Sequence, residues 1–252
     1  MMCVDKMAAL LAPEGRLRFS INLGNPVLAR RDDPKAEPHG VSVDIAKALA
    51  ERLNATAEFV VVTSARQSFE TVSSGRADIG FFAVDPDRSD RLGFTAPYLH
   101  IEGWYAVRDD SPIRTLAEVD QPGHRVVLSH GSAYDLFLSR ALKKAEIVRA
   151  PNPLAVTPIF LMQHVEVMAA VRQQLDSDMA TTPGLRLLPG RFMCIEQSVG
   201  FRRSFGSEAA RYLSAFVEEL KEKKRIDAFL ARHAICGATV APSAKSEEGA
   251  AD

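Results

Sequence analysis

Two arginines stand among three aspartates in the segment DPDRSDR, residues 85–91, where their guanidinium groups could bind an anion. A planar guanidinium matches a carboxylate through two parallel hydrogen bonds and keeps its charge when water is excluded. The segment follows an apolar run at 79–84, so either Arg88 or Arg91 could face a pocket. Runs of alternating charge are usually solvated turns, however, and Asp85 or Asp87 could form a structural ion pair with Arg88. The segment therefore leaves two interpretations open, an anion site or surface charge.

A second possible anion site is the sequence Gly131-Ser132-Ala133, which follows an apolar stretch at 125–128 and precedes a predicted helix. The first N–H groups of a helix have no partner within it, and the helix dipole favours a negative charge at that end. The Ser132 hydroxyl and the amides of Ala133 and Tyr134 would point the same way. A helix-capping role for Ser132 is the alternative, and it is compatible with binding.

Composition narrows the classes of function. The chain has 252 residues, of which 46% are hydrophobic and 25% charged, as in a globular protein with a large core. With 31 basic and 32 acidic residues, no excess charge suggests a nucleic-acid or membrane-surface partner. Cys3, Cys194 and Cys236 lack the spacing of a disulfide framework or a metal site. We therefore expect a small-molecule ligand, no metal and no cofactor.

The first residues bear on cellular location. A secretory signal needs a basic start and an apolar core of roughly 7–15 residues. Here the apolar run at 7–12 is short and Asp5 precedes it. No apolar run approaches the ~18 residues of a membrane span. The sequence as written predicts a cytoplasmic protein without membrane insertion, or a periplasmic one if translation starts upstream.

Strands and helices alternate along the chain, which predicts parallel sheets and an α/β fold. The first expected unit has a strand at 17–23, a helix capped by Ser42, a strand at 59–62, a helix at 66–74 and a strand at 77–84. The second has a strand at 125–128, a helix at 134–144, a strand at 146–148, a helix at 158–164 and a strand at 165–171. An extended segment at 192–201 and a helix from Ser207 follow, with Leu213, Phe216, Val217 and Leu220 on one helical face. Residues 241–252 are small, polar and charged, which predicts a disordered tail.

Five short motifs in order give a resemblance to a known family. They are LRFS at 17–20, GVSVDIAKALA at 40–50, SGRADI at 74–79, Arg88 ahead of FTAPY at 94–98, and VGFRR at 199–203. This order resembles the family-3 solute-binding proteins of polar amino-acid ABC transporters, which have the type II periplasmic-binding-protein fold. The resemblance spans about residues 15–235.

The resemblance implies two α/β lobes joined by a hinge of two crossover strands, which close on a ligand between them. Residues 1–99 and 197–252 would form lobe 1, and residues 100–196 would form lobe 2. The crossovers would lie near 100–102 and 194–196.

The resemblance also implies a binding site. Arg88 stands at the position that binds a ligand carboxylate, with Phe82, Ala83 and Asp85 in the loop before it. From the second lobe, Ser132, Ala133 and Tyr134 would contact the ligand at the start of their helix. Arg66 would face the cleft, or remain a solvated helix charge.

The chain departs from the family pattern at several of these positions. Asn25 stands where an aromatic residue usually stacks on the ligand, and the loop between Asp78 and Arg88 is shortened. Val171 takes the place of the acid that holds an α-ammonium group, and Arg172 follows as a possible second cation. An ordinary α-amino acid is therefore disfavoured as the ligand, unless Asp85 holds its ammonium group.

The leading functional hypothesis is a monomeric, non-enzymatic binding protein for a small carboxylate-bearing solute, such as an amino acid or a related organic acid. It would serve as the substrate-binding component of an ABC transporter, with the permease as partner, or as a soluble sensor. The alternative is a lyase on the same scaffold, similar to cyclohexadienyl dehydratase, with His130 and Glu166 as a proton-transfer pair. A third hypothesis is a domain that acts through another protein.

Overall fold

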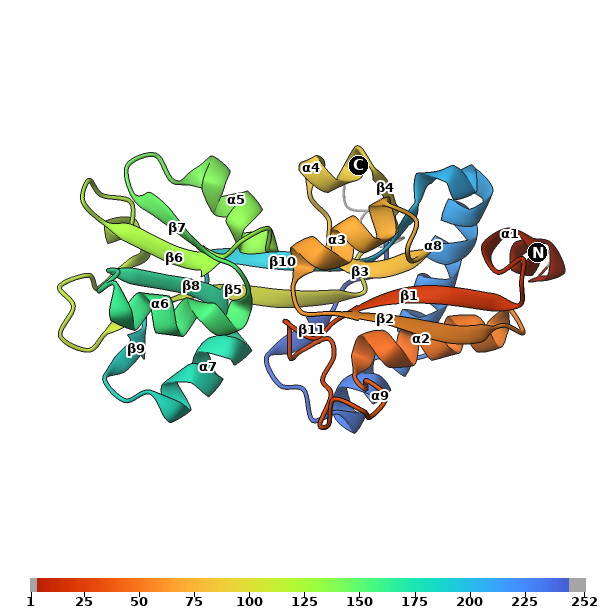
Figure 1. The fold of residues 1–252 in the computed structure, drawn as a ribbon, viewed down its shortest axis with the longest axis horizontal. Helices are drawn as coiled ribbons and strands as arrows, with labels where there is room; N and C mark the ends of the chain where they lie inside the picture. The colour runs from red at the N-terminus through yellow and green to blue at the C-terminus, as the bar shows by residue number, and fades with distance from the viewer. Residues whose placement is uncertain (1–3, 245–252) are drawn as a thin grey trace.

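The computed structural model describes residues 4–244 (Figure 1). The helices are α1 (Val4–Leu11), α2 (Val41–Arg52), α3 (Ala65–Ser73), α4 (Pro86–Ser89), α5 (Ala133–Ala141), α6 (Val156–Met162), α7 (Arg172–Thr181), α8 (Gly206–Glu222) and α9 (Arg225–Arg232). Three 3-10 helices are η1 (Leu116–Glu118), η2 (Pro153–Ala155) and η3 (Arg203–Phe205). The strands are β1 (Arg16–Asn22), β2 (Thr56–Val62), β3 (Ile79–Ala83), β4 (Leu92–Phe94), β5 (Leu99–Arg108), β6 (Arg125–Ser129), β7 (Glu146–Ala150), β8 (Val167–Val171), β9 (Leu185–Leu187), β10 (Met193–Arg202) and β11 (Ala238–Val240).

The strands of the described chain join one curled sheet with the main order β2-β1-β3-β10-β5-β8-β6-β7; off this path, β4 pairs with β10, and β9 and β11 pair with β5. β1 pairs in parallel with β2 and β3, and β6 pairs in parallel with β7 and β8. Helices connect these parallel strands, because a parallel partner can be reached only by a crossover connection. The two α/β units expected from the sequence are thus confirmed.

The fold has two lobes, and two long strands run between them (Figure 1). One lobe contains β1 to β4 with α1 to α4, α8 and α9; the other contains β6 to β9 with α5 to α7. β5 and β10 are antiparallel, with Ile195 opposite Ile101 and Glu196 opposite His100. The two segments predicted as crossovers are therefore neighbours in the sheet.

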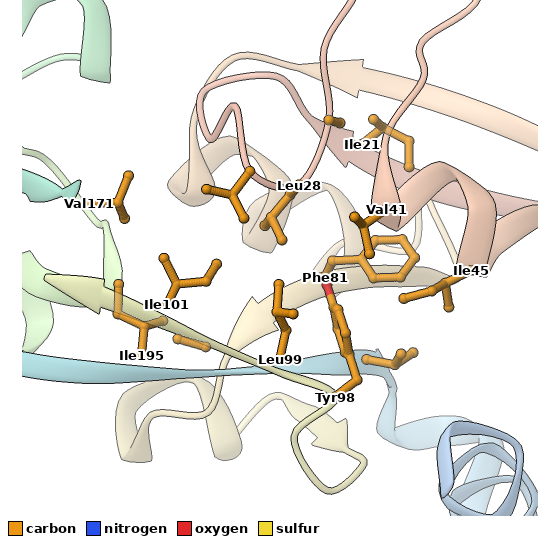
Figure 2. Close-up of a cluster of buried hydrophobic side chains, with 14 of the residues drawn as sticks. Ile21, Leu28, Val41, Ile45, Phe81, Tyr98, Leu99, Ile101, Val171 and Ile195 are labelled. Carbon is orange, nitrogen blue, oxygen red and sulfur yellow. The ribbon is translucent and has the colours of Figure 1, made fainter. Parts of the chain in front are cut away.

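A continuous hydrophobic core follows these strands through both lobes. β3 is buried along its whole length, since it lies inside the sheet with helices on both sides. Figure 2 shows the part of the core that runs from Val171, Ile101 and Ile195 at one end to Val41 and Ile45 at the other. In α8 the four apolar residues predicted to share a face are all buried: Leu213, Phe216, Val217 and Leu220.

Two local predictions were wrong. Ser42 does not cap α2; Gly40 occupies the N-cap position, with a φ of 134°, and Ser42 is buried inside the helix. A disordered tail was expected from residue 241, but Ala241 and Pro242 are held in place, because the Ala241 N–H donates to the Tyr98 carbonyl and the buried Lys221 ammonium donates to the Pro242 carbonyl. Residues 245–252 lie outside the described part of the chain.

Among residues 4–244, no helix combines the length and the hydropathy that crossing a bilayer requires.

Candidate functional site

A cavity of about 50 Å³ lies between the lobes. Side chains from both lobes line it, because the carboxyl ends of β1, β3, β6 and β8 and the middle of β10 converge there, as expected for ligand sites in α/β sheets. The lining residues are Asn22, Gly24, Asn25, Leu28, Ala65, Phe81, Phe82, Ala83, Arg88, Ser129, Ser132, Ala133, Tyr134, Pro153, Val171, Gln174, Ile195 and Gln197.

Arg88 projects into this cavity from the short helix α4. Asp85 caps that helix by accepting a hydrogen bond from the Asp87 N–H, and Pro86 occupies its first turn. The turn places Arg88 inward, where 4% of the residue is exposed, whereas Arg91 remains on the surface. Of the two arginines in this segment, the structure places Arg88 at the cavity.

The Arg88 guanidinium donates to backbone carbonyls of both lobes. Its Nη1 lies 3.2 Å from the Ala83 carbonyl oxygen, and its Nη2 lies 2.8 Å from that of Gly131. Burial lowers the pKa of Arg88 to about 10, although Asp85 and Asp87 favour the charged form, so the group remains a cation at neutral pH. No carboxylate in residues 4–244 forms an ion pair with Arg88.

Asp85 lies outside the cavity lining and is engaged elsewhere. Its carboxylate is 2.6 Å from Nη2 of Arg140 on α5, and a second Arg140 nitrogen lies 3.3 Å from Asp87. These ion pairs cross from one lobe to the other.

The second lobe contributes the loop before α5. Ser132 caps this helix, which was the alternative to its expected role in binding, and its Oγ accepts a hydrogen bond from the Asp135 N–H at 3.1 Å. Ala133 and Tyr134 also line the cavity, and burial raises the pKa of Tyr134 to about 12. Gly131 has a φ of 69°, and a Cβ there would lie 2.7 Å from the Arg66 side chain. Glycine is therefore required both by the backbone angle and by the close approach of the other lobe.

Two predicted ligand cations lie outside the cavity. Arg66 forms an exposed ion pair with Glu70 at 2.7 Å, and its side-chain carbons pack near Gly131. Arg172 forms an ion pair with Asp176 at 2.8 Å and lies over the Trp104 ring.

The suggested proton-transfer pair was wrong. His130 is exposed, and Glu166 is bound by Arg125 at 2.9 Å. Although burial favours its neutral form, the hydrogen bonds from Arg125 lower the pKa of Glu166. Glu166 precedes the first residue of β8, whereas the cavity lies at the last residue, Val171, roughly 15 Å away along a strand of this length.

Several residues that line the cavity were not predicted from the sequence. Asn22 and Ser129 end β1 and β6 and lie within one residue of the ends of the predicted strands. That position could have indicated them, since ligand contacts cluster at the carboxyl ends of strands. No pattern in the sequence indicated Gln174 or Gln197. Gln174 lies near the start of α7 and Gln197 lies within β10, and only the folded chain brings them to the cavity.

The amide groups of two lining asparagines are oriented by the backbone. Oδ1 of Asn22 accepts from the Gly24 N–H at 2.8 Å, and Oδ1 of Asn25 accepts from the Val27 N–H at 3.1 Å. Their NH₂ groups thus remain available to a ligand. The cavity offers hydrogen-bond donors around a buried cation, which suits an anion.

Comparisons with known proteins identify a family and a fold that are consistent with a solute site between two lobes. The model of the bacterial extracellular solute-binding proteins, family 3, matches residues 17–234. A cyclohexadienyl dehydratase from Pseudomonas aeruginosa is 28% identical over 162 residues, which is 59% of this chain and 60% of that protein's length. The matched part thus spans less than two thirds of this relative.

Solved structures share the fold. A solute receptor for L-cysteine from Neisseria gonorrhoeae has a TM-score of 0.76 at 18% identity, covering 90% of this chain and 92% of its own. A mutant of ArgBP from T. maritima has a TM-score of 0.75 at 17% identity, with coverages of 90% and 98%. An ancestral amino-acid-binding protein, described as a precursor of cyclohexadienyl dehydratase, has a TM-score of 0.75 at 18% identity, with coverages of 89% and 97%.

Proposed function

The chain belongs to the bacterial extracellular solute-binding proteins of family 3, and on this premise we propose that it binds a small carboxylate-bearing solute in the cavity between its lobes. The carboxylate would contact Arg88. Phe82, Ala83, Asn25, Ser132, Ala133 and Tyr134 would surround the rest of the solute, together with Asn22 and Gln197. Arg66, Arg172 and Asp85 are left out of this site, because each is paired outside the cavity.

The observation that supports this proposal most directly is the environment of Arg88. A buried charge is costly unless it is paired, and two backbone carbonyls replace only part of the water that the guanidinium loses. A carboxylate in the cavity would supply the missing counter-charge. The neighbouring N–H and O–H donors would bind the remaining oxygens.

The division into lobes is part of the proposal. We assign residues up to 99 and from 197 onward to lobe 1, and residues 100–196 to lobe 2. The pairing of Glu196 with His100 and of Cys194 with Glu102 supports these boundaries, because it places both changes of lobe side by side. Hinge bending at this point would open and close the cavity.

The cavity between the lobes is partly open and has a volume of about 50 Å³. Hinge bending that separates the lobes would give a solute more room to enter. Small-angle scattering should detect a smaller radius of gyration with a saturating solute than without it, and identical profiles would argue against the hinge.

The test of the site compares Arg88→Ala and Arg88→Lys with Arg91→Ala. A thermal-shift screen of amino acids, oxo acids, dicarboxylates and aromatic acids first identifies a solute that stabilises the wild type. Calorimetry with that solute should then show a roughly 30- to several-thousand-fold loss of affinity for Arg88→Ala. Arg88→Lys should retain part of the affinity, since it keeps the charge but not the planar geometry.

Arg91→Ala is the matched control, because Arg91 belongs to the same segment but is exposed, and it should change affinity less than about fivefold. Equal affinities of Arg88→Ala and Arg91→Ala would refute the assignment of Arg88. Circular dichroism of each variant shows whether the fold is intact.

We propose that the protein is not an enzyme, although one relative is named a dehydratase. The titratable groups in the described cavity lining are Arg88 and Tyr134, with pKa values of about 10 and about 12. Neither exchanges a proton readily at neutral pH, as general acid–base catalysis requires. NMR spectra of a bound solute should stay unchanged during long incubation with the protein; a new product would contradict this proposal.

Two cellular roles are compatible with the binding of a solute. As a transporter component it would deliver the solute to an ABC permease, and as a soluble sensor it would act without one. The cytoplasmic location expected from the sequence stays a prediction. Fractionation of cells that express the full chain tests it, and a processed periplasmic form would contradict it.

A further inference from the structure

The charges around the cavity narrow the chemical class of the solute. Among the described residues that line it, Arg88 alone carries a formal charge at neutral pH. The other polar groups are amides of asparagine and glutamine and the hydroxyls of Ser129, Ser132 and Tyr134. The cavity is therefore suited to one negative charge and has no carboxylate for a positive one.

The nearest carboxylates are already bound by other side chains. Asp85 pairs with Arg140 at 2.6 Å, and Asp135 pairs with Arg149 at 3.0 Å while also accepting from the Gly131 N–H. Asp178 accepts hydrogen bonds from Thr157 and from Gln174, both at 2.8 Å. None of the three lines the cavity.

Neutral oxygens could replace a carboxylate, but several of those at the cavity already accept a hydrogen bond. The carbonyls of Ala83 and Gly131 accept from Arg88 itself. The amide oxygens of Asn22 and Asn25 accept from backbone N–H groups. Gln174 retains its Oε1 as an acceptor, because its Nε2 donates to Asp178. The neutral acceptors that remain, on Gln174, Gln197 and the lining hydroxyls, compensate a buried ammonium poorly, since a desolvated charge needs a counter-charge as well as hydrogen bonds.

We infer that the solute is an organic acid that lacks an α-ammonium group, such as a 2-oxo or 2-hydroxy acid. This inference rests on the proposed binding of a carboxylate at Arg88. An oxo or hydroxyl oxygen at the second carbon can accept from the asparagine NH₂ groups, whereas an ammonium there would face these donors and the Arg88 cation. The protein thereby differs from the amino-acid-binding proteins whose fold it shares.

The test uses acids of matched shape. Calorimetry measures the binding of L-alanine, pyruvate and L-lactate, and of L-leucine with its 2-oxo and 2-hydroxy analogues. We expect the best oxo or hydroxy acid to bind at least about 30-fold more tightly than the amino acid of the same skeleton, a difference of about 2 kcal/mol.

The outcomes separate this inference from the proposed function. An amino acid that binds as tightly as its analogues, with affinity that depends on Arg88, would overturn the inference and leave the proposed function in place. If no acid of the panel binds, and Arg88→Ala does not weaken binding of the solute from the thermal-shift screen, both the inference and the proposed function are wrong.

A substitution at Val171 should reverse the preference. Val171 is 6% exposed, lies at the cavity and occupies the N-cap position of α7, where aspartate is a favourable residue. Val171→Asp should weaken binding of the oxo acid and strengthen binding of the amino acid by about tenfold or more. Val171→Asn has the same shape without the charge, so it should leave the order of affinities unchanged.

A second acidic variant guards against misfolding. Asn22→Asp supplies the carboxylate from the end of β1 if Val171→Asp fails to fold, which a thermal melt would reveal; it keeps the shape of the side chain and the hydrogen bond from the Gly24 N–H. Acidic variants that fold but leave the ratio of amino-acid to oxo-acid affinity at its wild-type value would contradict the inference.

Discussion

Asp85 and Arg140 join the two lobes through an ion pair of 2.6 Å at the edge of the cavity. Asp85 caps α4, the helix that presents Arg88, and Arg140 lies on α5, whose first residues line the opposite wall. The pair can form only when α4 and α5 approach each other. It therefore stabilises the closed arrangement without contacting the solute.

Replacing Arg140 by alanine should weaken solute binding about three- to tenfold. The closed form loses an ion pair whose carboxylate is buried but whose guanidinium is 47% exposed, so the effect is modest. Binding requires the closed form, and a smaller closed population lowers the apparent affinity in proportion. Calorimetry with the solute from the thermal-shift screen measures the change.

Arg125→Ala provides the control for this prediction. Arg125 pairs with Glu166 within one lobe, at the end of the sheet far from the cavity, so its loss should affect stability rather than affinity. If the two variants lose affinity equally, the pair between Asp85 and Arg140 has no special role in closure.

The affinity for an anion should be constant from about pH 6 to about pH 9 and should fall as the pH rises through about 10. Burial lowers the pKa of Arg88 from its ordinary value to about 10, so the cation that binds the carboxylate is lost as the pH rises through that value. Without a ligand the effect on stability has the opposite sign. The folded chain holds this proton less tightly than the unfolded chain, so the buried charge lowers stability fully below about pH 10, and this cost fades as the pH rises from there towards the ordinary pKa of arginine.

Calorimetric titrations at a series of pH values check this expectation. A fall in affinity between about pH 6 and pH 8 would contradict it, since it would indicate a second titrating group at the site.

Met7→Ala should lower the free energy of unfolding by about 2–5 kcal/mol, the usual cost of truncating a buried core residue. Met7 is fully buried in α1, which contacts α8, so this helix is part of the folded core. Lys6→Ala removes an ion pair to Glu208 from a side chain that is 64% exposed, and should cost at most about 1 kcal/mol. Denaturant titrations of both variants measure the difference. Equal stabilities would mean that α1 does not contribute to the core.

The alternation of apolar stretches was enough to predict the order of strands and helices within the two α/β units, because buried parallel strands and amphipathic helices leave distinct patterns. The capping of α5 by Ser132 was one of the two roles that its position before a helix allowed. The ion-pair partners of the charged side chains could not be predicted from the sequence. Arg66, Asp85 and Arg172 were expected at the ligand, yet each has an ion-pair partner within reach that only the folded structure reveals.

The cavity also depends on register, which local patterns do not determine. Gln197 enters the lining because it lies opposite Ala83 and Leu99, the residues that end β3 and begin β5. A shift of one residue would turn its side chain to the other face of the sheet.

The position of β10 between β3 and β5 determines when each part of the chain can fold during synthesis. When β1, β2 and β3 have left the ribosome, β3 still has an open edge, because its partner is the segment Gln197–Phe201. The strands from β5 to β8 follow one another along the chain and can assemble before β10 is made. The lobe at the amino terminus is therefore completed last, and until β10 is made the open edge of β3 is exposed to aggregation or chaperone binding.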